Sequence, residues 1–80
     1  MIKVFGAGVI SHIFEVESKV LDESSHMIRY HYTVVPGSLC YIKDNKVCYF
    51  EADFLGKYPT DECRDPTKRE LELYESADVI

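Results

Sequence analysis

The residues of this 80-residue chain best suited to bind a metal ion or to act as nucleophiles are three cysteines and three histidines: Cys40, Cys48, Cys63, His12, His26 and His31. Structural zinc sites usually take cysteine pairs with roughly two to four residues between them. Here the two gaps between successive cysteines are seven and fourteen residues, and no Cys-x-x-Cys or His-x-His pair exists. The spacing therefore predicts no metal site and no cofactor. Cys40 and Cys48 are interpreted as small apolar packing residues.

Nucleophilic catalysis would need a Cys or Ser next to a general base, held by a sharp turn or a helix start. The sequence has no glycine elbow and no helix start beside a cysteine, and Ser24-Ser25-His26 has the composition of a turn. FGAGV, residues 5–9, has too few glycines and no following lysine for a phosphate-binding loop. We therefore expect that the protein is not an enzyme.

Length and composition predict one soluble domain with a modest core, since 46% of the residues are hydrophobic and 29% are charged. No apolar run reaches the ~20 residues that span a bilayer. The VFGAGVISHIF segment after Lys3 resembles a secretory core, but it contains His12, meets Glu15 and lacks a cleavage pattern, so we expect no signal peptide. An odd number of cysteines argues against a disulfide framework and favours a reduced, cytoplasmic setting.

The net charge of −5 comes entirely from the last thirty residues. Residues 1–50 carry five acidic and five basic residues, whereas residues 51–80 carry nine acidic and four basic ones. Nucleic acid is a less favoured partner, because phosphate binding needs clustered cations. A basic protein surface fits the charge better.

Two segments alternate in the manner of strands, residues 8–21 and 26–35. The apolar parity of the first, typical of a half-buried strand, contains Ile10, Phe14, Val16 and Val20. That of the second contains Ile28, Tyr30, Tyr32 and Val34. Turn residues at 22–26 separate the two strands, and Pro36-Gly37 ends the second.

A hairpin is predicted over residues 40–48, and its register depends on the length of the loop. A three-residue loop of Lys43-Asp44-Asn45, with its last residue left-handed, sets Cys40 opposite Cys48. A two-residue turn instead pairs Cys40 with Tyr49 and opposes two lysines. Because directly opposed like charges are unfavourable, we expect the three-residue loop.

The remaining segments predict short helical elements. EADFLGKYP, residues 51–59, indicates a helical turn closed by Gly56 and followed by a loop. Asp65-Pro66 has the pattern of a helix start, with a helix from Lys68 to Ala77, although RELELYE also alternates as a strand would. The expected organisation is a small β-barrel or sheet over residues 1–60, with an acidic tail over residues 61–80 packed on the same domain. A helix is favoured over a strand for this tail.

Two stretches carry a resemblance to a known fold. VCYFEADFLGKYP resembles the end of SH3-like barrels of the Tudor type, where an apolar-x-apolar strand runs into an acidic turn and then Leu. GAGVISHIFEV resembles the bent opening strand of such modules. The resemblance covers roughly residues 5–58 and implies an SH3-like barrel, with an OB-like barrel as the alternative. It also implies that aromatic residues near Asp53 form a cage for a cationic or methylated side chain.

Five of the six tyrosines are divided between a core role and a contact role. Tyr30 and Tyr32 are interpreted as core residues. Tyr41, Tyr49 and Tyr58 lie near loops, where an amphipathic ring suits a binding surface. Alternatively, bases could stack on a sheet face that contains Arg29, Tyr30, His31 and Tyr32.

The sequence as a whole predicts a small acidic, non-catalytic, mainly β module that binds another protein with a basic surface. The expected contact residues are Tyr41, Tyr49, Asp53, Tyr58, Asp61, Glu62, Glu70 and Glu72. One form of this function is an accessory factor or inhibitor of the phage or mobile-element type that mimics the charge of nucleic acid. The alternative is a nucleic-acid-binding small barrel that uses aromatic stacking. A homodimer stays open, because apolar residues occupy both parities of residues 9–14.

Overall fold

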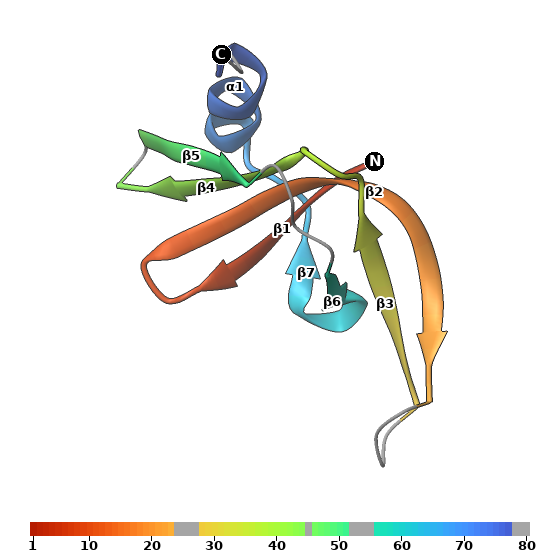
Figure 1. Cartoon of the computed structure of the whole chain (residues 1–80). Helices are drawn as coiled ribbons and strands as arrows, with labels where there is room; N and C mark the ends of the chain where they lie inside the picture. Colours follow the sequence, from red (N-terminus) through yellow and green to blue (C-terminus); the bar gives the residue numbers. More distant parts are fainter. Residues whose placement is uncertain (24–27, 45, 52–55, 78–80) are drawn as a thin grey trace.

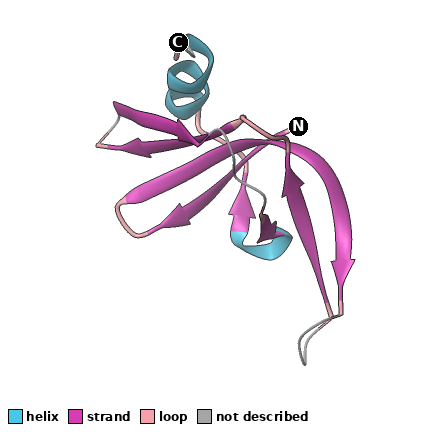
Figure 2. Ribbon diagram, in the orientation of Figure 1, coloured by secondary structure: helices cyan, strands magenta, loops and turns pink. Residues whose placement is uncertain are grey.

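A bent antiparallel sheet and one short C-terminal helix make up the fold in the computed structural model, which describes residues 1–23, 28–44, 46–51 and 56–77 (Figures 1 and 2). The elements are β1 (Ile2–Ala7), β2 (Ile10–Asp22), β3 (Arg29–Val34), β4 (Leu39–Lys43), β5 (Lys46–Glu51), β6 (Lys57–Pro59), η1 (Thr60–Glu62), β7 (Cys63–Arg64) and α1 (Lys68–Ser76). The predicted fold class is confirmed in its open form, since the sheet does not close into a barrel.

The long strand β2 belongs to both halves of the sheet. Its first half pairs with β1 on one edge and with β4 on the other, within the order β5-β4-β2-β1-β7. Its second half, residues 16–22, pairs with β3, and β3 in turn pairs with β6. The register shifts between Val16 and Ser18. Such a bulge bends a strand, and Figure 1 shows the bend of β2.

Two separate clusters of buried residues lie on the two faces of the bent sheet. The first contains Val4, Ile13, Cys40 and Ile42, and Leu73 and Tyr74 of α1 pack against it. The second contains Phe14, Val34, Leu39 and Tyr58. Neighbours on β2 therefore point into different clusters, and both Ile13 and Phe14 are fully buried. The prediction of a half-buried strand is wrong at this point, because α1 covers the face that the alternation assigned to solvent.

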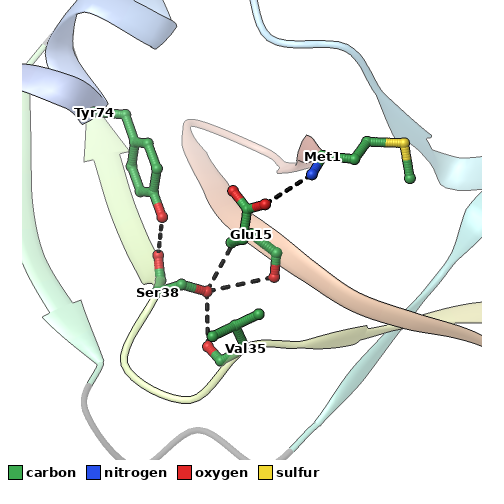
Figure 3. A network of polar contacts seen from close by, with 5 residues as sticks. All are labelled: Met1, Glu15, Val35, Ser38 and Tyr74. Carbon is green, nitrogen blue, oxygen red and sulfur yellow. Dashed lines mark hydrogen bonds and ion pairs between the residues drawn. The ribbon is translucent and has the colours of Figure 1, made fainter.

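The C-terminal helix begins at Lys68, as predicted, but its N-cap is a different residue from the predicted one. Thr67, and not Asp65, is the N-cap, and it forms a capping box with Glu70. Tyr74 fixes the helix to the sheet, because its hydroxyl donates to the Ser38 carbonyl at 2.7 Å (Figure 3). The Ser38 hydroxyl in turn donates to the Val35 carbonyl at 2.7 Å and accepts from the Glu15 amide at 3.1 Å. Helix and strand were both open for this segment, and the structure makes it a helix.

The β4–β5 hairpin has a different register from the predicted one. Cys40 pairs with Phe50, and a register shift lies between Tyr41 and Ile42, so the expected pair of Cys40 with Cys48 is wrong. Lys43 and Lys46 are opposed as in a two-residue turn, and Asp44 is left-handed with φ of 54°. Asn45, to which the prediction gave that conformation, lies outside the described residues.

The segment after this hairpin also departs from the prediction. Residues 57–59 were expected to form a loop, but they form strand β6 against β3. The expected helical turn at residues 52–55 lies outside the described residues. The 3-10 turn η1 then leads into β7, which pairs with β1, so that part of the expected tail adds a strand to the sheet.

Candidate functional site

The outer part of the β2–β3 hairpin extends away from the rest of the sheet, at the opposite end of the view from α1 (Figure 1). We call residues 18–23 and 28–32 of this hairpin the arm. Successive side chains of a strand point to opposite faces, so the arm has two faces of different composition. Leu21 lies opposite Tyr30, and Asp22 lies opposite Arg29. The first pair belongs to the apolar face of the arm and the second to its polar face.

Charged partners from β6 and η1 cover the polar face. Arg29 donates to Asp61 at 2.7 Å and to Glu62 at 3.1 Å. The hydrogen bond from Arg29 to Asp61 holds the pKa of Asp61 below its ordinary value. On the same face the Lys57 ammonium lies 2.9 Å from the Asp22 carboxylate. The polar face is thus a set of ion pairs within the chain.

A histidine completes the polar face. The Nδ1 atom of His31 lies 3.8 Å from the Asp22 carboxylate, and both side chains are only 15% exposed. That separation is too long for a hydrogen bond. His31 and Arg29 therefore lie on the polar face, opposite to the face that carries Tyr30.

The apolar face is open to solvent instead. Leu21 is 48% exposed, Tyr30 is 50% exposed and Ile28 is 69% exposed. Lys19 lies on the same face, with its ammonium 4.8 Å from the centre of the Tyr30 ring. Nearer the body of the sheet, the same face of β3 carries Tyr32 and Val34, which pack into the second buried cluster. The apolar face of the arm therefore extends a core surface beyond the core.

An aromatic group centred on His12 lies beside the second buried cluster, to which Phe5, Tyr41 and Tyr58 belong. The His12 ring lies 4.7 Å from that of Tyr41, 5.7 Å from that of Tyr58 and 5.9 Å from that of Phe5, measured between ring centres. Its Nδ1 atom is 2.9 Å from the Tyr58 hydroxyl, and burial lowers the pKa of His12. These rings pack on one another, so the described members form part of the core.

The predicted contact tyrosines are placed differently from the expectation. Tyr58 is 7% exposed, stacks on Phe14 at 4.8 Å between ring centres, and has a pKa raised by burial. The expectation that Tyr58 lies on a binding surface is therefore wrong, because Tyr58 is a core residue. Tyr41 is partly buried in the aromatic group. The backbone of Tyr49 pairs with Tyr41, while the Tyr49 side chain and Asp53 lie outside what the structure describes.

The predicted acidic contact residues have partners inside the chain. Glu70 accepts from the two Arg64 Nη atoms at 2.6 and 2.8 Å, and this ion pair lowers the pKa of Glu70 to about 2. Glu72 lies 3.9 Å from Arg69 on the same helix. Asp61 and Glu62 are likewise paired with Arg29. These four acids therefore present less unpaired negative charge than the sequence suggests.

Leu21, Ile28 and Tyr30 are exposed, although the sequence did not place them among the expected protein-contact residues. Tyr30 was interpreted as a core residue, and that interpretation is wrong. Alternation assigns Ile28 and Tyr30 to the face of Tyr32 and Val34, but it does not show where along β3 the core ends. No sequence signal marks that point, because it depends on which distant residues pack against this face of β3, as Phe14, Leu39 and Tyr58 do near Val34.

The described residues provide no arrangement for metal or thiol chemistry. Among residues 1–23, 28–44, 46–51 and 56–77, no three His, Cys, Asp or Glu side chains gather as metal ligands would. Burial raises the pKa of Cys63 to about 11, so that this thiol is protonated at neutral pH. In the same part of the chain, no helix combines the length and the apolar character that a membrane crossing requires.

Comparison of the chain with protein-family models, with curated proteins and with solved structures finds no match. The resemblance to SH3-like barrels of the Tudor type stays a prediction from residue types.

Proposed function

We propose that this chain is a non-catalytic protein-binding module and that its contact surface is the apolar face of the arm. The observation that supports this function is that the burial of the two faces is the reverse of the usual arrangement. Charged partners within the chain cover the polar face of the arm, whereas its apolar face is exposed. Soluble proteins ordinarily bury such a face, and an exposed apolar group with polar surroundings is typical of an interaction site.

Burial of the apolar face would contribute part of the free energy of a specific complex. Leu21, Ile28 and Tyr30 are each about half or more exposed. Covering them would stabilise a complex by roughly 3–5 kcal/mol. Tyr30 is the best single anchor, because its ring is large and loses few rotamers on binding.

Apolar contact, rather than the acidic tail, is the main source of affinity in this proposal. The predicted acids Asp61, Glu62 and Glu70 have cations within the chain. We therefore expect partner affinity to change by less than about threefold between ~50 and ~300 mM salt. An affinity that falls steeply with salt would restore the acidic surface as the main contact. That the partner is a host protein inhibited by charge mimicry stays a prediction from size and charge.

A pull-down with matched variants tests the proposal. Tagged wild-type chain, Leu21→Ser and Tyr30→Ser are incubated with lysate of the native host, and bound proteins are quantified by mass spectrometry. Val9→Ser is the control, because Val9 is 74% exposed at the turn of the other hairpin, β1–β2. A partner held by the wild type and the control, and reduced at least about tenfold by both arm variants, supports the proposal. Equal retention by all four proteins contradicts it.

Nucleic-acid binding is the second candidate, and one contact favours it. Lys19 lies over the exposed Tyr30 ring, so a cation and a stacking surface occur together. Arg29 and His31, which the stacking hypothesis also used, lie instead on the covered polar face. A gel shift with single- and double-stranded oligonucleotides at low salt distinguishes the two candidates. A retarded band that Tyr30→Ala abolishes would favour nucleic acid.

A further inference from the structure

We propose that the arm pairs with the arm of a second copy of this chain, through the free edge of β2. The inference shares the arm with the proposed function but uses a different part of it, since it uses the backbone edge and leaves the apolar face open. Dimer formation is measured on the purified chain alone. Its failure would therefore leave partner binding by a monomer intact, and the reverse also holds.

The edge that would pair is the continuation of the β1 side of β2. The ladder with β1 ends at Glu15, and the Val16 amide donates to the Met1 carbonyl at 2.8 Å. Beyond this point residues 18–21 pair with β3 alone among the described strands. Figure 1 shows no element beside the outer edge of this part of β2. A row of backbone donors and acceptors at such an edge is a template for another strand.

The sequence at this edge is complementary to itself when two copies run antiparallel. A two-fold axis through a facing residue pair keeps each face of the sheet in register with itself. With the axis at Leu21, the two Leu21 side chains face each other and Lys19 of each copy faces Glu23 of the other. Lys19, Leu21 and Glu23 are all exposed, so their side chains are accessible to the second copy. An apolar pair flanked by two ion pairs is a favourable cross-strand set.

Neighbouring registers are less favourable. An axis at Lys19 opposes two lysines, and an axis at Asp22 opposes two aspartates. An axis at Val20 places Lys19 against Leu21. The charges therefore select the register that is centred on Leu21.

This register would also enlarge the proposed contact surface. Leu21 lies opposite Tyr30 within each copy, so the paired arms form a four-stranded ribbon with a continuous apolar strip. The strip runs from Tyr30 through the two Leu21 side chains to Tyr30 of the second copy. The contact is short, which places it at the weak end of protein interfaces. Association is therefore to be measured from ~1 to ~500 µM, in the range where such contacts saturate.

Charge-swap variants test the register. In a dimer of the Lys19→Glu variant, position 19 of each copy would face Glu23 of the other, so that two pairs of like negative charges are opposed. In a dimer of the Glu23→Lys variant, two pairs of like positive charges are opposed in the same way. We expect each variant alone to dimerise about tenfold more weakly than the wild type in sedimentation equilibrium. The mixture of the two variants, and the double variant, recover the wild-type association, because every pair is again of opposite charge. Circular dichroism of each variant verifies the fold.

A cross-linking measurement covers the case in which a single variant is unfolded. Leu21→Cys places two thiols at a directly facing position, within reach of a disulfide. Oxidised Leu21→Cys gives a covalent dimer on a non-reducing gel, whereas the wild-type chain and Val9→Cys do not. The inference is overturned if the wild type stays monomeric over the whole concentration range, or if the single variants dimerise as strongly as the wild type. It is also overturned if mixing the two variants does not restore dimerisation, or if Leu21→Cys cross-links no more than Val9→Cys.

Discussion

Removal of the Glu70 carboxylate should weaken the fold more than any other change on the surface of α1. This carboxylate accepts from the Thr67 amide at 2.9 Å, which completes the capping box, and it binds the Arg64 guanidinium. The side chain is 13% exposed, whereas that of Arg64 is 48% exposed. Loss of the capping interaction costs about 1 kcal/mol. Loss of an ion pair with one exposed partner costs up to about 1 kcal/mol more.

Glu70→Ala should therefore lower the free energy of unfolding by about 2 kcal/mol, from a total of roughly 4–12 kcal/mol for a chain of this length. The midpoint of thermal unfolding should fall by about 8–16 °C. Glu70→Gln keeps an acceptor for the Thr67 amide but loses the charge, so about half of the effect should remain. Glu75→Ala is the matched control, since Glu75 lies on the same helix and is exposed. Urea unfolding followed by circular dichroism measures all four proteins.

The pH dependence provides an independent measurement of the same carboxylate. Its pKa falls from 4.5 to about 2 in the folded chain, chiefly through the hydrogen bond with Arg64. Between these values the unfolded chain binds more protons than the folded one, so stability decreases as the pH is lowered through this window. Glu70→Gln should flatten that part of the curve. The reasoning is refuted if Glu70→Ala matches Glu75→Ala in urea, or if the acid-dependent loss is unchanged in Glu70→Gln.

Three further outcomes follow from the structure. Tyr74→Phe removes the hydrogen bond to the Ser38 carbonyl and should destabilise the fold by about 1 kcal/mol, measured by urea unfolding; a neutral result would mean that packing alone holds α1. Gly37→Ala should cost about 1 kcal/mol in the same assay, through backbone strain at φ of 83° and not through contact, because an added Cβ meets nothing within 4 Å. At pH 8 iodoacetamide should modify Cys40 and Cys63 much more slowly in the folded chain than in urea, because Cys40 is buried and the pKa of Cys63 is raised to about 11; equal rates by mass spectrometry would contradict this.

The alternation of apolar residues predicted the strands because it follows from backbone geometry alone. Tyr30, Tyr32 and Val34 do share one face of β3. The same pattern could not tell which of them are covered, since that depends on which distant residues pack against this face. Tyr30 was therefore assigned to the core and Tyr58 to the surface, and the structure places them the other way round.

The acidic tail illustrates the same limit for charge. The count of nine acids in residues 51–80 is correct from the sequence, and it predicted a surface for a basic partner. For Asp61 and Glu62 the cation comes from a distant position, Arg29. A charge count does not contain that information, because pairing across 32 residues is decided by the sheet.

By itself, the sequence determined that this chain is a small, mainly β protein with a C-terminal segment able to form a helix. These properties depend on local backbone preferences and side-chain periodicity. Only the tertiary structure decided that the sheet stays open, that both faces of β2 are buried near Ile13 and Phe14, and that the arm exposes its apolar face. The reason is that a strand presents two equivalent faces and two equivalent edges, and only contacts between distant segments determine which of them are covered.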